Sequence, residues 1–163
     1  MAVPEVIPIA YEPNHRTDTI GRYTDGQFLA TVTYAFPTGF RPDDGWEDHK
    51  RLYAVLHTFD SAGHHRDAQI WCAGTWSEQQ RDPYGDQSVV GRARAHLTKL
   101  LSSLPGLSYT DIAVRPFQLT YDNVLFGLVV DKSDAEDTED DDWAELLPDG
   151  LGFGSPWKGQ YDI

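Results

Sequence analysis

The sequence predicts an α+β fold: a single antiparallel sheet built from hairpins, with one long helix packed on a face and a docked C-terminal segment. Three observations support this prediction. Two pairs of β-forming segments joined by short turns occur before residue 75, one amphipathic segment of helical period follows, and a further hairpin pattern comes after it. Because segments adjacent in sequence usually pair in space, the economical arrangement is one sheet with the helix across it.

Length and composition fit one domain over residues 1–163. The chain is 40% hydrophobic and 12% aromatic, which supplies enough apolar side chain for one core and argues against a disordered chain. Its first apolar run, residues 6–10, is surrounded by Pro4, Pro8 and Pro13. We therefore expect an edge strand or an extended arm there.

Two hairpins are predicted next. Segments 20–23 and 27–36 flank Asp25-Gly26, a pair that tolerates the positive φ angles of a tight turn. Segments 52–59 and 68–73 flank a second turn at residues 61–63. Because segment 52–59 is apolar at both odd and even positions, we expect it in the centre of the sheet, covered on both faces.

One long helix is predicted between about residues 86 and 104. Asp86 is a candidate N-cap, Asp82 before Pro83 is an alternative start, and Pro105-Gly106 ends the helix. Apolar side chains recur at three- and four-residue spacing and form one stripe, made of Val89, Val90, Ala93, Leu97, Leu100, Leu101 and Leu104.

The last third of the chain predicts a hairpin, an acidic loop and a docked end. Segments 111–119 and 124–130 flank Asp122-Asn123, with Pro116 marking a bulge or an exposed edge. Residues 131–142 hold eight acidic residues and one lysine, and such a run repels itself, so we expect a mobile loop. The aromatic and apolar residues from Trp143 onward predict a segment that docks back on the domain.

Charge narrows the classes of partner. The net charge is −13, more than half of it in the run 131–142, and the pI is about 4.6. A grip on phosphates needs clustered Lys and Arg, so we expect no direct binding of nucleic acid and no binding to an anionic membrane. No apolar stretch approaches the ~20 residues of a bilayer span, and Cys72 is the single cysteine. We expect a cytoplasmic protein, and its oligomeric state stays open.

The histidines raise the question of a metal site. His64 and His65 lie in the predicted turn near Asp60 and Asp67, but no third ligand is defined and there is no HExxH or HxH pattern. We favour a structural or solvent-exposed role for both. His57 lies inside an apolar strand, where a hydrogen-bonded core histidine is a more common arrangement than a catalytic base.

A second candidate cluster runs from Asp43 to His49. The sequence Asp43-Asp44-Gly45-Trp46-Glu47-Asp48-His49 packs four carboxylates and an imidazole into seven residues. Paired carboxylates can share a proton or hold a divalent ion. A hydrated loop is the alternative we favour, in which Glu47 and Asp48 cap a short helical turn before the next strand.

The remaining motifs point away from cofactors. Cys72 has no CxxC partner and is expected to act as a small core hydrophobe. Gly150, Gly152 and Gly154 alternate in what we expect to be a loop, without the strand-to-helix context of a nucleotide site. The acidic run lacks the glycine of an EF-hand loop. We therefore expect no cofactor, no metal site and no catalytic residues.

Two charged surfaces remain as candidates for binding a partner. The acidic run would attract a basic protein and speed its association, through Asp134, Glu136, Asp137, Glu139, Asp140, Asp141 and Asp142. The predicted helix carries a cationic arc of Arg92, Arg94, His96 and Lys99. Pairing of this arc with the chain's own acidic loop and binding of a partner are both open.

The chain also resembles a known family. The segment Thr17-Asp18-Thr19-Ile20-Gly21-Arg22-Tyr23, the block Trp46-Glu47-Asp48-His49-Lys50-Arg51 and the ending Trp143-Ala144-Glu145-Leu146 with Leu151-Gly152-Phe153 and Pro156-Trp157 resemble small actinobacterial proteins labelled formate hydrogenlyase regulatory protein HycA. The opening 2–10 shares this likeness. The resemblance implies a regulatory or binding role without a cofactor, on an α+β fold.

The predicted function is therefore that of a non-enzymatic, acidic regulatory or binding protein that acts through protein–protein contacts with a basic partner. One alternative is an immunity-type protein that neutralises a basic toxin. Another is a metal-dependent hydrolase that uses His57, His64, His65 or the cluster from Asp43 to His49. Convergence of these side chains in one cleft would favour the hydrolase.

Overall fold

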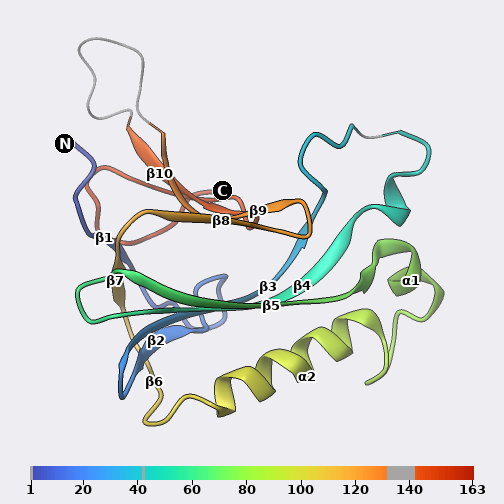
Figure 1. The fold of residues 1–163 in the computed structure, drawn as a ribbon, viewed down its shortest axis with the longest axis horizontal. Coiled ribbons are helices and arrows are strands. Elements are labelled where there is room, and N and C mark those ends of the chain that lie inside the picture. The colour runs from blue at the N-terminus through green and yellow to red at the C-terminus, as the bar shows by residue number, and fades with distance from the viewer. Residues whose placement is uncertain (1, 42, 132–141) are drawn as a thin grey trace.

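The computed structural model describes residues 2–41, 43–131 and 142–163, and β-strands make up most of its regular structure (Figure 1). Three antiparallel sheets hold these strands. The elements in chain order are β1 (Ile7–Ile9), β2 (Ile20–Tyr23), β3 (Gly26–Ala35), the 3-10 helix η1 (Trp46–Asp48), β4 (Arg51–Phe59), β5 (His65–Thr75), α1 (Trp76–Arg81), α2 (Val89–Ser102), β6 (Ser108–Tyr109), β7 (Ile112–Val114), β8 (Phe117–Tyr121), β9 (Val124–Asp131), β10 (Trp143–Leu147) and β11 (Leu151–Gly154).

The largest sheet has five strands in the order β5-β4-β3-β2-β6. Its β2–β3 and β4–β5 hairpins are the two that the turn sequences predict. The central position of β4 is also confirmed, since it pairs with β3 on one side and β5 on the other, and Leu52 to His57 are all buried. Side chains on both of its faces are shielded, which is why the strand is apolar at both parities.

The second sheet corrects the predicted fold class. Its order is β11-β10-β9-β8, so the C-terminal residues form two strands of a separate four-stranded sheet and are not a segment docked on a single sheet. The expected loop at residues 150–154 is likewise wrong, because Leu151–Gly154 is β11. The α+β prediction of one sheet with a helix on a face is therefore wrong, and the described fold is mostly β.

A two-stranded sheet is the second departure from the predicted single sheet. Ile7 of β1 pairs with Val114 of β7, so the first apolar run finds its partner more than a hundred residues away. The predicted third hairpin is correct only between β8 and β9. Pro116 separates β7 from β8 and lets the chain pass from one sheet to another, because proline has no N–H to continue a ladder.

The elements form three layers, with α2 on one face of the five-stranded sheet and the four-stranded sheet on the other (Figure 1). Alternation along β3 produces this arrangement. Phe28 and Ala30 pack with Leu97 of α2, whereas Leu29 packs with Leu128 of β9 on the opposite face. The larger sheet is therefore buried on both sides.

The long helix α2 begins later than predicted. Ser88 is its N-cap, with its hydroxyl accepting from the Gly91 N–H at 3.0 Å, and neither Asp86 nor Asp82 takes that role. The preceding short helix α1 begins with a capping box between Thr75 and Glu78. In the part of the chain that the structure covers, neither helix combines the length and apolarity that crossing a bilayer requires.

Candidate functional site

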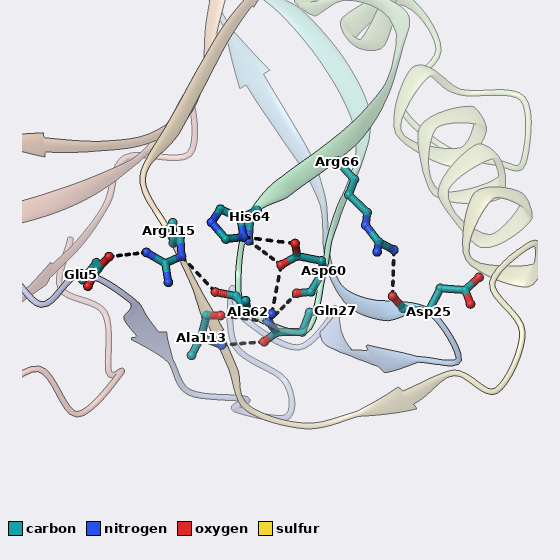
Figure 2. Close-up of polar contacts among 9 residues, drawn as sticks. All are labelled: Glu5, Asp25, Gln27, Asp60, Ala62, His64, Arg66, Ala113 and Arg115. Atoms are coloured by element: carbon teal, nitrogen blue, oxygen red, sulfur yellow. Dashed lines mark hydrogen bonds and ion pairs between the residues drawn. The ribbon is translucent and has the colours of Figure 1, made fainter.

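His64, the first candidate metal ligand, lies in the turn between β4 and β5 and contacts Asp60 there. Asp60 accepts hydrogen bonds from the backbone N–H groups of Ala62 and His64 through Oδ1, and its Oδ2 lies 3.1 Å from Nδ1 of His64 (Figure 2). These donors hold the pKa of Asp60 below its ordinary value, with the His64 backbone bond contributing most. His64 therefore serves the turn in which it lies.

The same turn is held from two other sides. Gln27, which is 1% exposed, donates from Nε2 to the carbonyls of Asp60 and Ala113 and accepts from the Ala113 N–H at 2.8 Å (Figure 2). Arg115 donates to the Ala62 carbonyl and to Glu5. The contacts of Asp60, Gln27 and Arg115 are all made to groups of the protein itself, which is typical of a structural network.

His65 faces away from His64 and pairs with His57. Nδ1 of His57 lies 3.1 Å from Nε2 of His65, and the ring of His65 stacks on Phe117 with 4.4 Å between centroids. Burial lowers the pKa of His57 to about 3, with the nearby His65 adding to the effect, and burial also lowers the pKa of His65. Both rings are thus neutral at pH 7, and the hydrogen bond joins the buried His57 to the partly buried His65.

Of the residues named for a metal or hydrolase site, His57 and His65 come together, and neither His64 nor the cluster from Asp43 to His49 joins them. His64 and His65 point to different partners, and the cluster from Asp43 to His49 precedes β4 whereas His57 lies near the end of that strand. Within residues 2–41, 43–131 and 142–163, no group of three or more His, Cys, Asp or Glu side chains is arranged to hold a metal ion. Cys72 is half-buried against the core between the sheets, and burial raises the pKa of its thiol.

The cluster from Asp43 to His49 contains the short helical turn that the sequence predicts, but Glu47 and Asp48 lie within the turn and do not cap it, since Gly45 is the N-cap. Trp46–Asp48 is the 3-10 helix η1, and Asp43, Asp44, Glu47 and Asp48 are all exposed. Asp43 accepts from the Gly45 N–H at 2.8 Å, and Asp48 accepts from Ser77 of α1 at 2.6 Å. The four carboxylates therefore stay hydrated, and two of them also hold the loop.

An aromatic patch lies beside these carboxylates and was not predicted. It is formed by partly exposed rings that contact one another in a chain, namely Tyr34, Phe36, Phe40, Trp46 and Trp76. They come from β3, the β3–β4 loop, η1 and α1. No common period links the four segments, so only the folded chain brings the rings together.

Lys50 reaches into the aromatic patch. Its ammonium lies 4.8 Å from the ring centre of Trp76, 5.0 Å from that of Tyr34 and 5.9 Å from that of Trp46. Cations bind the faces of aromatic rings at such distances because each face carries negative electrostatic potential. The patch therefore already holds one positive charge among its rings.

The predicted cationic residues lie on α2, where the sequence places them. Arg94 and Lys99 are exposed, and Arg92 is half-buried, 3.9 Å from the carboxylate of Glu78. His96 stacks on Trp71 at 4.3 Å. The ends of the acidic run, Asp131 and Asp142, lie at the four-stranded sheet, on the other side of the five-stranded sheet from α2 (Figure 1).

Most of the predicted acidic surface lies outside the described residues. This applies to Asp134, Glu136, Asp137, Glu139, Asp140 and Asp141, and only Asp142 of the seven lies within them. The expectation of a mobile loop at 131–142 falls mainly on the same residues. Its ends are described, since Asp131 closes β9 and Trp143 opens β10.

The structure also contains a buried carboxylate that the sequence does not predict. Asp149, in the turn between β10 and β11, accepts a 2.7 Å hydrogen bond from Thr31 and lies 3.5 Å from the guanidinium of Arg16. Its side chain is 2% exposed, and burial raises the pKa of the carboxyl group. The three residues are far apart in sequence and no motif links them.

Comparison with known proteins adds nothing to these geometric observations. The chain matches no protein-family model, no curated protein and no solved structure.

Proposed function

We propose that this chain is a non-enzymatic binding protein of regulatory type that recognises a basic protein partner through the aromatic patch and the carboxylates around it. The observation that carries the proposal is the position of the Lys50 ammonium among three rings. A surface that already accepts one internal cation has the chemistry to accept a partner's arginine or lysine.

The composition of the patch supports a role in protein recognition. Tryptophan and tyrosine are enriched among residues that dominate binding energy, since they supply large rigid contact area. Here Tyr34, Trp46 and Trp76 are neither buried nor fully exposed. Such side chains can gain further contact area when a partner covers them.

Charge supports a basic partner. Four exposed carboxylates, Asp43, Asp44, Glu47 and Asp48, flank Trp46 of the patch within six residues of sequence. Carboxylates at the edge of an interface steer an oppositely charged partner and raise its association rate, an effect that salt screens. The sequence predicts that the acidic run 131–142 attracts a basic partner. Among the described residues, we assign that role to these four carboxylates.

The proposal keeps the interpretation that the family resemblance implies, a regulatory or binding role without a cofactor. A toxin-neutralising immunity protein is a special case of it, in which the basic partner is a toxin. The cytoplasm, expected from the sequence, remains the proposed compartment, and fractionation of source cells would check it.

Charge reversal at matched sites tests the proposal. The double variant Asp44→Lys, Glu47→Lys removes two carboxylates of the patch, and the control Asp25→Lys, Asp67→Lys makes the same change at exposed positions at the other end of the sheet. Each tagged protein is used to capture binding proteins from source cells at low and high salt. We expect the wild type and the control to retain a basic protein that the patch variant loses.

Two outcomes would contradict the proposal. Equal capture by both double variants would move the binding surface elsewhere, and an acidic captured protein would exclude the charge argument. A captured nuclease or other toxin would instead favour the immunity-type role over a general regulatory one. Circular dichroism of each variant checks that the fold is intact.

A further inference from the structure

A hollow of about 390 Å³ opens between the loop before β2, the edge of β3 and the helix α2. It exists because β2 is short: Ile20 pairs with Leu29, so β2 leaves the edge of β3 beyond Ala30 uncovered. The volume falls in the range of sites for small organic molecules. Its lining is made of His15, Arg16, Asp18, Thr19, Thr31, Val32, Arg94 and Leu97.

One charged side chain of the hollow forms an ion pair with another described residue of the protein, and two do not. Arg16 is already paired, since its guanidinium lies 3.5 Å from the buried carboxylate of Asp149. Arg94 and Asp18, by contrast, make no side-chain ion pair or charged hydrogen bond with any residue that the structure describes. The hollow therefore presents one unpaired cation and one unpaired anion that do not neutralise each other.

The uncharged groups that line the hollow further limit which ligand fits. The hydroxyl of Thr19 donates to the Ala30 carbonyl and that of Thr31 donates to Asp149, so neither hydrogen is available to an anion. Val32 and Leu97 supply apolar surface. Because Ala30 donates its N–H to Thr19 on this edge, strand alternation directs the backbone N–H of Val32 to the same uncovered edge.

We propose that this hollow binds a free amino acid with an apolar side chain, whose carboxylate pairs with Arg94, whose ammonium pairs with Asp18 and whose side chain contacts Val32 and Leu97. A simple anion would satisfy Arg94 and leave Asp18 unpaired, whereas a simple cation would do the reverse. A molecule with both charges and an apolar part pairs with Arg94 and Asp18 together and also covers Val32 and Leu97.

L-leucine is the probe, and two of its derivatives separate the charges. N-acetyl-L-leucine keeps the carboxylate but has no ammonium, and L-leucinamide keeps the ammonium but has no carboxylate. Binding to the full chain is followed by two-dimensional NMR of backbone amides during titration to millimolar concentrations. We expect L-leucine to shift the amide signals of Thr31 and Val32, and each derivative to bind at least tenfold more weakly.

Variants that each remove one charge test which residues bind the carboxylate and the ammonium of L-leucine. Arg94→Gln and Asp18→Asn are each expected to weaken L-leucine at least tenfold. Lys99→Gln removes a charge from an exposed position of the same helix that does not line the hollow, and Asp25→Asn removes one from the β2–β3 turn, which does not line it either, so both should bind as the wild type does.

The proposal is overturned if L-leucine shifts no signal of the hollow, or if Arg94→Gln binds as well as Lys99→Gln. Equal affinity for N-acetyl-L-leucine would also overturn it and would show an anion site instead. Equal affinity for L-leucinamide would show a cation site. Because the aromatic patch shares no residue with the hollow, failure here leaves the proposed protein-binding function unaffected.

Discussion

The Nδ1 atom of His57 lies 3.1 Å from the Nε2 atom of His65, so one imidazole donates to the other where a buried ring meets a partly buried one. His57 is 2% exposed, and both rings contact Phe117. The bond requires at least one unprotonated acceptor nitrogen, and burial disfavours a charge on either ring. The pair therefore links the stability of the folded protein to pH.

Stability is expected to fall as the pH drops below 6.5. The folded protein holds the pKa of His57 near 3 whereas the unfolded chain has the ordinary value of 6.5, so the unfolded state binds the proton first. The contribution is complete above pH 6.5 and is lost at up to about 1.4 kcal/mol per pH unit below it. Urea unfolding between pH 7.5 and pH 5 measures this loss.

The variant His57→Leu should reduce that loss by roughly 2 kcal/mol at pH 5, because it removes the group that the unfolded state protonates. His15→Gln removes a histidine from the surface and serves as the control. An unchanged pH dependence in His57→Leu would assign the effect to other groups.

Gln27→Leu is expected to lower the free energy of unfolding by roughly 3 kcal/mol at pH 7. The substitution leaves the carbonyl and the N–H of Ala113 without their side-chain partner at a buried position, and it removes one of the two hydrogen bonds of the Asp60 carbonyl, which keeps the bond from the Gly63 N–H. Gln118→Leu, on the exposed edge strand β8, should change stability by less than about 1 kcal/mol. Urea unfolding of both variants checks the difference, and equal losses would contradict it.

Local signals in the sequence predicted local structure well. The Asp25-Gly26 turn, the apolar character of β4 at both parities and the apolar stripe of α2 each depend on residues close in sequence, and each prediction is confirmed in outline. Such signals report the period of a segment and the chemistry of its turn. They do not report which distant segment will pair with it.

The allocation of strands to sheets depended on distant pairing, and there the prediction was wrong. Ile7 and Val114 pair although 107 positions separate them, and Pro116 ends β7 so that β8 joins the other sheet. The candidate sites follow the same rule. Tyr34 and Trp76 become neighbours only through the β4–β5 hairpin, and Thr31 meets Asp149 across the two sheets.

Two hydrogen bonds to one carboxylate oxygen join β4 to the β8–β9 turn. The Tyr53 hydroxyl donates to Oδ2 of Asp122 at 2.8 Å, and Arg51 donates to the same atom at 2.6 Å. Tyr53→Phe and Asp122→Asn are each expected to cost about 1 kcal/mol, since the asparagine keeps an acceptor and tolerates the positive φ of 55° at this position.

The double variant should cost less than the sum of the two single variants, because Tyr53→Phe removes the hydrogen bond that Asp122→Asn weakens. Tyr121→Phe, at an exposed tyrosine in the same turn, is the control and should have little effect. Strictly additive costs would indicate that the two residues act independently.

Asp149→Asn is expected to stabilise the protein at neutral pH, although it removes a hydrogen-bonded carboxylate. The fold raises the pKa of Asp149 chiefly by burial, which outweighs the bond from Thr31 and the charge of Arg16. A raised carboxyl pKa means that the folded state binds the proton more tightly, so stability decreases as pH rises from the ordinary value of 3.8 to the folded pKa. Asparagine keeps an oxygen to accept from Thr31 and carries no charge to bury, so its advantage should be greatest at pH 7 and vanish near pH 4.

Thermal unfolding at the two pH values shows whether Asp149→Asn raises or lowers the melting temperature, with Asp162→Asn at an exposed position as control. A lower melting temperature for Asp149→Asn at pH 7 would mean that the ion pair with Arg16 outweighs the cost of burial.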